Sequence, residues 1–133
     1  VRRWARQRGS LLGRYTTTVD GMFEEQSAPQ TMGDRQGLRQ LTLDNDATQL
    51  QITTEGMVAF SLSHFDDAQF NYDVFYGGKH PYDLVRSPQI FAHFDFWQRG
   101  IGNHSCGGDS CLPQYMAPTG SHEFTLRFTP MAK

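Results

Sequence analysis

Residues 89–115 read QIFAHFDFWQRGIGNHSCGGDSCLPQY, an apolar stretch followed by a glycine-rich loop that holds both cysteines of the chain. Side chains alternate across a pleated strand, which places Ile90, Ala92, Phe94 and Phe96 on one side and Phe91, His93, Asp95 and Trp97 on the other. Because both sets are largely apolar, the stretch predicts a central strand covered on both faces. The glycines that follow let the chain leave the sheet, and we expect ligand contact on the loop that begins there.

The composition is that of one ordinary globular domain. The chain has 133 residues, of which 38% are hydrophobic and 20% charged, with a formal net charge of -2. No apolar run approaches the roughly 20 residues that cross a bilayer. Residues 1–10 carry four arginines around one tryptophan and are interpreted as a basic arm, with the domain proper at 11–133. Since the whole chain is slightly acidic, neither nucleic acid nor a membrane is expected as a partner.

Alternating apolar and polar residues predict six strands, at 15–19, 41–43, 50–52, 58–64, 90–97 and 122–130. A turn at 44–46 and another at Glu55-Gly56 predict two neighbouring hairpins. Between the fourth and fifth strands, Asp66 or Asp67 is expected to cap a helical turn over 68–72. The pattern therefore predicts an all-β fold, an antiparallel β-sandwich.

The loop of the opening stretch offers three kinds of cysteine chemistry. A Cys2His2 zinc set can be written from His104, Cys106, Cys111 and His122, although the spacing matches none of the usual ligand pairs. A disulfide between Cys106 and Cys111 is possible across the glycines that separate them. Cys106 with His104 would form a nucleophile and base without an evident third orienting group. We expect two free thiols, and the zinc site, the disulfide and the cysteine nucleophile remain open alternatives.

Glycoside hydrolysis needs two carboxyl groups held across a sugar. The adjacent or nearby carboxylates are Glu24 with Glu25, Asp44 with Asp46, and Asp66 with Asp67. All of them fall in predicted turns or loops, where carboxylates are usually solvated. No acid and base pair emerges from this pattern.

A histidine and carboxylate pair and a set of aromatic residues can each be interpreted as structural or as functional. His93 and Asp95 share one face of the predicted central strand, and we interpret them as a structural hydrogen-bonded pair. Flat rings suit the apolar face of a sugar, so a candidate sugar-binding surface consists of Phe91, Trp97, Phe70, Tyr72, Phe75 and Tyr76. Most of these aromatic side chains are expected in the core.

A series of motifs resembles one known family. In chain order they are GRYTTTVDGMF at 13–23, Pro29-Gln30 and Gly33, Asp95 and Gln98, GIGNHSCGG at 100–108, Leu112-Pro113-Gln114-Tyr115, and FTLRFTP at 124–130. Their order and spacing over residues 9–129 resemble the C-terminal small-chain domain, domain 5, of the large bacterial β-galactosidases of glycoside hydrolase family 2.

The resemblance implies part of a supersandwich similar to galactose mutarotase, beside a TIM barrel that holds both catalytic glutamates. The chain is then expected to be a non-catalytic domain of a retaining hydrolase, inactive alone. The resemblance aligns the loop at 102–107 with the rim of the galactose pocket. It implies that the substrate-binding residues of this chain are Asn103, His104, Ser105 and Cys106. Many family members carry a tryptophan under the sugar where this chain has Cys106, and a thiol offers far less apolar area for stacking.

The resemblance also implies partners. The chain matches about the second half of such a domain, so the remaining domains of a β-galactosidase are expected partners, with the galactoside bound through the assembled pocket. Exposed strand edges favour a homo-oligomer. No cofactor is expected in this chain, since the family uses Mg²⁺ and Na⁺ in other domains, and a bacterial cytoplasm or periplasm is the expected compartment.

Two alternatives remain. A free-standing carbohydrate-binding sandwich would use exposed aromatic residues and show saturable affinity for galactose or lactose. A mutarotase-like enzyme would need a histidine and a carboxylate in one cleft, for which His93 and Asp95 are the candidates.

Overall fold

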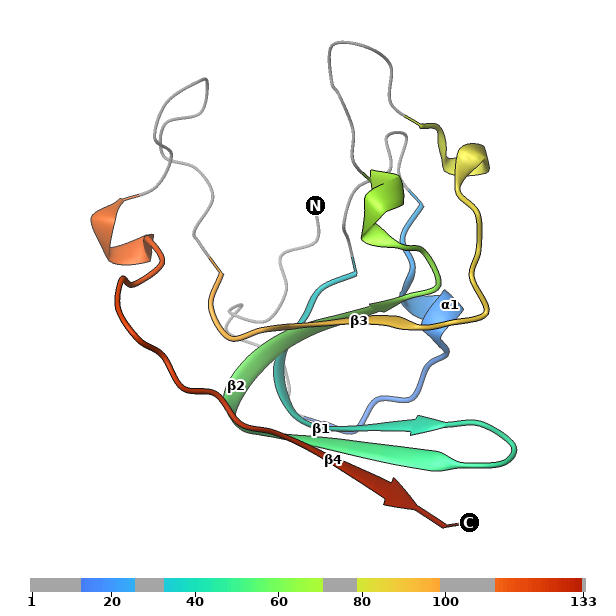
Figure 1. Ribbon diagram of the computed structural model, residues 1–133, viewed down its shortest axis with the longest axis horizontal. Helices are drawn as coiled ribbons and strands as arrows, with labels where there is room; N and C mark the ends of the chain where they lie inside the picture. The colour runs from blue at the N-terminus through green and yellow to red at the C-terminus, as the bar shows by residue number, and fades with distance from the viewer. Residues whose placement is uncertain (1–12, 26–32, 71–78, 99–111, 133) are drawn as a thin grey trace. The chain divides into compact units, whose positions relative to one another are not determined.

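The computed structural model describes residues 13–25, 33–70, 79–98 and 112–132 (Figure 1). Its elements are α1 (Val19–Met22), β1 (Arg35–Asp44), β2 (Gln49–Ser63), η1 (Asp67–Phe70), η2 (Pro81–Asp83), β3 (Phe91–Asp95), η3 (Pro113–Tyr115) and β4 (Leu126–Met131). The predicted all-β class is confirmed, with four strands among the described residues in place of the six expected. None of the described helices is long and apolar enough to cross a membrane.

The chain divides into two compact units. One unit comprises residues 1–37 and 60–94, and the other comprises residues 38–59 and 95–133. β1 and β2 each pass from one unit into the other. His64, Arg86 and His93 belong to the first unit, and the pairing of β2 with β4 belongs to the second.

The hairpin predicted around 44–46 is confirmed. The backbone N–H of Asn45 donates to the carbonyl of Thr48 at 3.1 Å. The Asn45 side-chain oxygen accepts from the N–H groups of Ala47 and Thr48, at 2.9 and 2.8 Å. A short polar side chain that satisfies the turn's own amides is the usual chemistry of such turns, so this connection follows from local sequence.

The second predicted hairpin is wrong, because β2 continues through Glu55 and Gly56 without a break. Gly56 has φ +85°, a backbone conformation that glycine adopts without a steric penalty. The Thr54 hydroxyl donates to the carbonyl of Leu38 at 2.9 Å, which ties the neighbouring strand to this point. The glycine therefore marks an irregularity inside one long strand.

The sheet is organised around β2 and not around the stretch at 89–98. The strand order is β1-β2-β3, and β4 also pairs with β2. Among the described residues β3 thus lies at an edge, and the flanking Ile90 and Trp97 are exposed. The expectation of a central strand covered on both faces is wrong here, since β2 is long enough to pair with β3 and β4 in succession along its length.

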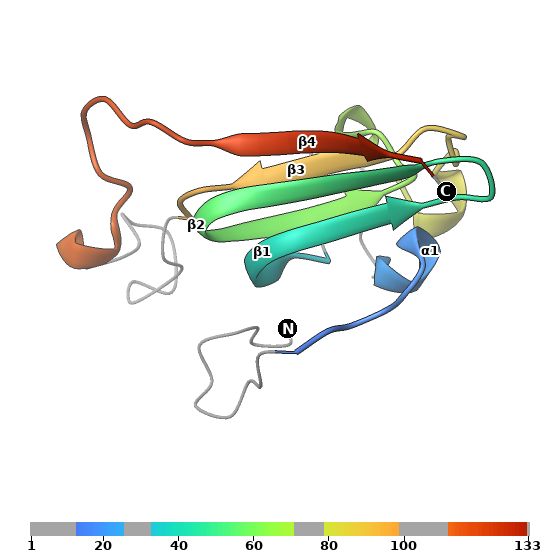
Figure 2. The ribbon, with the colours of Figure 1, turned by 90° about the horizontal axis from the view of Figure 1, so that it is seen from below.

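β4 pairs with β2 in antiparallel register, from Gln49 opposite Met131 to Thr54 opposite Leu126. Figure 2 shows β4 beside β2, with β1 on the other side of β2. The last predicted strand therefore exists, but it begins at Leu126 rather than at His122.

The strand predicted at 15–19 is wrong. Residues 13–18 form no strand, and α1 begins at Val19. The Thr18 hydroxyl accepts from the N–H of Gly21 at 3.0 Å, which caps this helical turn. Gly33 has φ +80°, and a Cβ built there would lie 2.8 Å from the carbonyl oxygen of Met22. Only glycine fits that approach between the end of α1 and the start of β1.

The core of the described residues is small. Its buried apolar side chains are Met22, Leu38, Ile52, Val58, Ala59 and Leu62. Most of them belong to β2, so burial and sheet order both identify β2 as the structural centre.

Candidate functional site

The predicted pocket-rim residues lie outside the described part of the chain. Asn103, His104, Ser105 and Cys106 fall within 99–111, as does Cys111, so the rim, the disulfide and the cysteine nucleophile stay predictions. The described residues contain no group of three or more histidine, cysteine or carboxylate side chains that could hold a metal ion.

His122, the fourth member of the zinc set, lies within the described residues. It is exposed, and its Nε2 lies 3.3 Å from the carbonyl oxygen of Pro118. Its ring centroid is 6.3 Å from that of Phe124. The expectation that a strand opens at His122 is wrong, because the ladder of β4 starts later in the chain.

A small hollow lies in the first unit, at the end of β2. Its lining residues are Phe23, Ser61, Leu62, Ser63, Asp67, Phe70 and His93. The space enclosed is about 10 Å³, roughly what one water molecule needs. A pyranose ring does not fit into it. This hollow therefore places a histidine beside a carboxylate without forming a sugar pocket.

The partner of His93 is Asp67 and not Asp95. His93 Nε2 lies 3.1 Å from Asp67 Oδ1, and both side chains are partly exposed. Asp95 accepts a hydrogen bond from Gln98 Nε2 at 3.2 Å. Residues two apart on a strand are separated by roughly 6.6 Å, whereas η1 brings Asp67 directly to the imidazole. The predicted His93–Asp95 pair is a wrong expectation, and the mutarotase-like alternative loses its candidate pair with it.

Two of the other carboxylates considered for catalysis, Asp66 and Asp44, have local roles. Asp66 Oδ1 accepts from the N–H of Ala68 at 2.9 Å and caps η1, as the sequence predicted. Asp44 Oδ2 accepts from Gln49 Nε2 at 2.8 Å beside the hairpin turn. These contacts agree with the interpretation of both residues as turn carboxylates.

The predicted aromatic surface is only partly described. Phe70 and Phe91 are half-buried and Trp97 is exposed, while Tyr72, Phe75 and Tyr76 lie outside the described residues. Phe70 lines the hollow beside His93. Its position fits the structural reading of this residue rather than a sugar platform.

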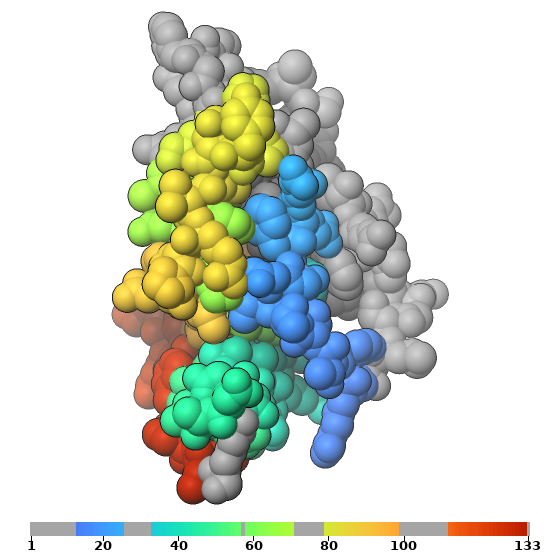
Figure 3. Space-filling view, turned by 90° about the vertical axis from the view of Figure 1, so that its right-hand side faces the viewer, coloured from blue at the N-terminus to red at the C-terminus, as the bar shows by residue number. Residues whose placement is uncertain are grey.

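An ion pair joins α1 to the segment before β3. Arg86 donates to both carboxylate oxygens of Asp20, with its Nη2 atom 3.0 Å from Oδ2 and 3.2 Å from Oδ1. The hydrogen bond from the Arg86 guanidinium lowers the pKa of the Asp20 carboxyl below its usual value. Figure 3 shows the blue segment 13–25 lying along the yellow segment that contains Arg86.

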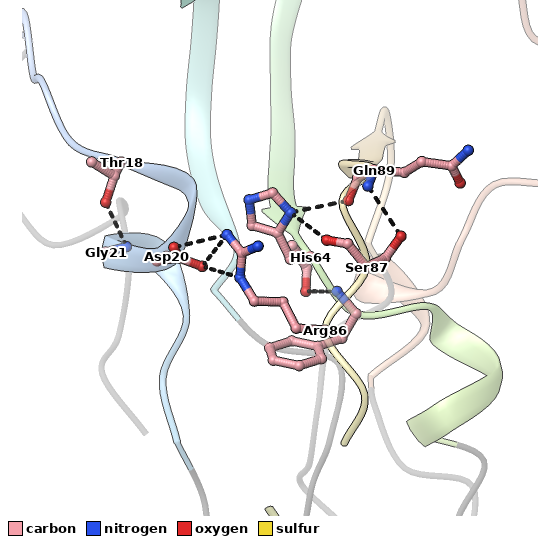
Figure 4. Close-up of polar contacts among 9 residues, drawn as sticks. Thr18, Asp20, Gly21, His64, Arg86, Ser87 and Gln89 are labelled. Carbon is pink, nitrogen blue, oxygen red and sulfur yellow. Dashed lines mark hydrogen bonds and ion pairs between the residues drawn. The ribbon is translucent and has the colours of Figure 1, made fainter. Parts of the chain in front are cut away.

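His64 holds the same segment from the end of β2 (Figure 4). The N–H of Ser87 donates to the His64 carbonyl at 2.8 Å. The His64 Nδ1 atom lies 3.0 Å from the carbonyl oxygen of Ser87 and 3.1 Å from that of Gln89. Because both neighbours are acceptors, Nδ1 carries the proton and donates to them.

Gln69 of η1 completes the attachment. Its Oε1 accepts from the N–H of Val85 at 2.7 Å, and its Nε2 donates to the Val85 carbonyl at 2.9 Å. The segment 85–89 is thus fixed by His64, Gln69 and Asp20, and we call this set of contacts the clamp. It determines the path by which the chain enters β3.

Sequence reasoning missed the clamp and the His93–Asp67 pair. Asp20 and Arg86 are 66 positions apart, and His64 is 23 from Ser87. Ordinary spacing motifs operate over a few residues, so no local signal identified these partners.

The arrangement is that of an all-β domain whose polar side chains position connections around a long strand. Residues 4–129 match the family model described as "Beta galactosidase small chain". The chain belongs to this family. It is also 27% identical, over 124 residues, to a beta-galactosidase of Vibrio cholerae serotype O1.

That alignment covers 92% of this chain and 11% of the Vibrio protein. The chain therefore spans about a tenth of the length of the relative it matches. The family resemblance inferred from the ordered motifs is confirmed by these comparisons.

Proposed function

We propose that the chain is a non-catalytic C-terminal domain of a β-galactosidase that hydrolyses terminal β-D-galactosides. The observation that carries this proposal is the family match over residues 4–129 in a chain that aligns with 11% of a beta-galactosidase. The two carboxyl groups that a retaining glycosidase needs would then come from another domain of the same enzyme. Metal ions used by the parent enzyme, Mg²⁺ and Na⁺, are assigned to its other domains.

Within this proposal, the loop at 102–107 contributes to the rim of the galactose pocket through Asn103, His104, Ser105 and Cys106. The support is the run GIGNHSCGG in its place after the strand that ends at Asp95. The partners are the remaining domains of the enzyme, the galactoside in the assembled pocket, and further copies of the enzyme.

The test of the general proposal is an activity assay on the chain alone and in the full-length enzyme. The isolated chain should give no turnover of a chromogenic galactoside above the buffer rate, whereas the full-length enzyme should turn it over. Hydrolysis by the isolated chain at an ordinary enzymatic rate of about 1 s⁻¹ or more would overturn the proposal.

The rim assignment needs variants in the full-length enzyme. Asn103→Ala and His104→Ala should each raise the KM for the galactoside by roughly 5–30-fold, because a lost polar contact costs about 1–2 kcal/mol. Cys106→Ala should change KM less, since a thiol stacks weakly. Cys111→Ala is the matched cysteine control and should leave KM unchanged. An unchanged KM in the first two variants would contradict the assignment of this loop to the pocket rim.

A free-standing carbohydrate-binding module is the alternative function. Galactose or lactose titrated into the isolated chain should then give saturable binding, whereas a detached pocket rim should give almost none. The comparisons favour the small-chain domain over this alternative.

A further inference from the structure

The turn at η2 presents an aromatic side chain to solvent. Tyr82 is 80% exposed, and its ring stacks on that of His80, with the centroids 4.9 Å apart and an interplanar angle of 15°. Since the imidazole lies against one face of the phenol ring, a side chain this exposed has its opposite face open to solvent. η2 is the yellow turn of Figure 1 and lies within the first unit.

Hydrogen bonds hold the backbone of this turn. The N–H of Asp83 donates to the carbonyl of His80 at 2.9 Å, and the N–H of Leu84 donates to that of Pro81 at 3.3 Å. The N–H of His80 donates to Asp83 Oδ2 at 2.8 Å. Pro81 fixes its own φ, and the clamp begins at Val85, directly after the turn. The exposed tyrosine therefore stands on a turn whose backbone is fixed on both sides.

The same kind of turn forms at η3 without a stacked pair of rings at the equivalent positions. There the N–H of Tyr115 donates to the carbonyl of Leu112 at 2.8 Å, and the N–H of Met116 donates to that of Pro113 at 3.2 Å. Leu112 and Gln114 stand where η2 has its histidine and its tyrosine. This backbone conformation therefore does not depend on the stacked rings of η2.

A single exposed tyrosine is ordinary on a protein surface, so the groups around it decide what it can bind. A flat ring suits the apolar face of a sugar. In galactose the axial hydroxyl leaves one ring face lined by C–H groups, which matches the open face of Tyr82. The exposed Asp83 carboxylate can accept hydrogen bonds from sugar hydroxyls, and the exposed His80 imidazole has ring nitrogens that donate or accept. These three side chains supply the groups that recognise a pyranose.

We propose that Tyr82, His80 and Asp83 form a surface site that binds a terminal β-galactoside. The inference rests on the proposed function, which makes galactosides the sugars that this chain meets. An open platform covers one face of one sugar unit, so the expected Kd is about 1–30 mM. Order in the turn lowers the entropic cost of binding, because the ring is held in place before the sugar binds.

The test is an NMR titration of the chain with methyl β-D-galactopyranoside. The backbone amide shifts of His80, Tyr82 and Asp83 should change in a saturable way, with a Kd of about 1–30 mM. Tyr82→Ala should weaken this binding roughly 5-fold or more, because the platform is lost. Tyr82→Phe keeps a flat ring, and its Kd should stay within about threefold of the parent value. The absence of saturable shifts at η2, or an equal Kd in Tyr82→Ala, would overturn the proposal.

Tyr115→Ala is the matched control, because it removes an exposed tyrosine from the equivalent turn η3. Its Kd should stay within about twofold of the parent value. Saturation-transfer NMR on the parent chain gives a second measurement that needs no variant. Irradiation of the aromatic protons of the protein should transfer magnetisation mainly to the C–H groups on the apolar face of the sugar. Equal transfer to all sugar protons would contradict stacking.

The outcomes also separate this site from the proposed function. Saturable shifts at η2, together with a full-length protein that lacks galactosidase activity, would retain the site and overturn the function. Activity of the full-length protein without shifts at η2 would do the reverse. Saturable shifts around Phe91 and Trp97 in place of η2, persisting in Tyr82→Ala, would favour the free-standing carbohydrate-binding module and overturn the site at η2.

Discussion

Replacing His64 with leucine should loosen the segment 85–89 while leaving the pairing of β2 intact. The imidazole Nδ1–H is shared between the carbonyl oxygens of Ser87 and Gln89, at 3.0 and 3.1 Å. Its loss removes one shared donor and leaves a partly buried acceptor at Ser87 and an exposed acceptor at Gln89 to water, at a cost of about 1–2 kcal/mol. The Ser87 amide, which donates to the His64 carbonyl at 2.8 Å, should then exchange with solvent roughly 5–30-fold faster.

Amide hydrogen exchange followed by NMR measures this effect at individual residues. His64→Asn is the matched control, because its side-chain amide nitrogen can donate from a position close to that of Nδ1. Exchange at Ser87 in this control should stay within about twofold of the parent chain. Exchange at Ile52, within β2, should change in neither variant. Equal acceleration by asparagine and leucine would show that the donor is irrelevant, and unchanged exchange at Ser87 in the leucine variant would refute the clamp.

Three further predictions follow from the described residues. Ile52→Ala should lower the free energy of unfolding by about 2–4 kcal/mol because it leaves a cavity at a 2% exposed position, whereas Thr53→Ala on the other face should change it by less than about 1 kcal/mol, both measured by urea denaturation. Gly56→Ala should cost about 1–2 kcal/mol through its φ of +85°, with thermal unfolding as the assay. The hydrogen bond from Arg86 lowers the pKa of the Asp20 carboxyl. The contribution of this contact to the free energy of unfolding is therefore complete above the unfolded-state pKa of about 3.9 and is lost as pH falls through the folded-state pKa. An NMR titration of Arg86→Gln should show a higher Asp20 pKa, and an unmoved pKa would contradict the ion pair.

Local chemistry explains which parts of the fold could be predicted. The hairpin at 44–46 was predicted because Asn45 satisfies the amides of its own turn. The cap of η1 by Asp66 was predicted for the same reason. The Glu55-Gly56 dipeptide misled because a glycine with positive φ serves a turn and an irregular strand equally well.

The candidate site was less predictable because its partners come from distant parts of the chain. His93 was singled out from the alternation of its strand, but the same alternation suggested Asp95 in place of Asp67. The apolar character of 89–98 was read as central burial. A strand at a sheet edge can also carry exposed apolar side chains, and the sequence alone does not distinguish such an edge strand from a buried central strand.

By itself the sequence determined the all-β class, the first hairpin and the small-chain family, because alternation, turn chemistry and ordered motifs act over short stretches or accumulate along the chain. Only the tertiary structure decided that β2 is the centre of the sheet, that Asp67 is the partner of His93, and that Arg86 reaches Asp20. The physical reason is that such contacts depend on the path of the backbone through space. Hydrogen bonds and ion pairs form wherever that path brings complementary groups within about 3 Å, at any separation in sequence.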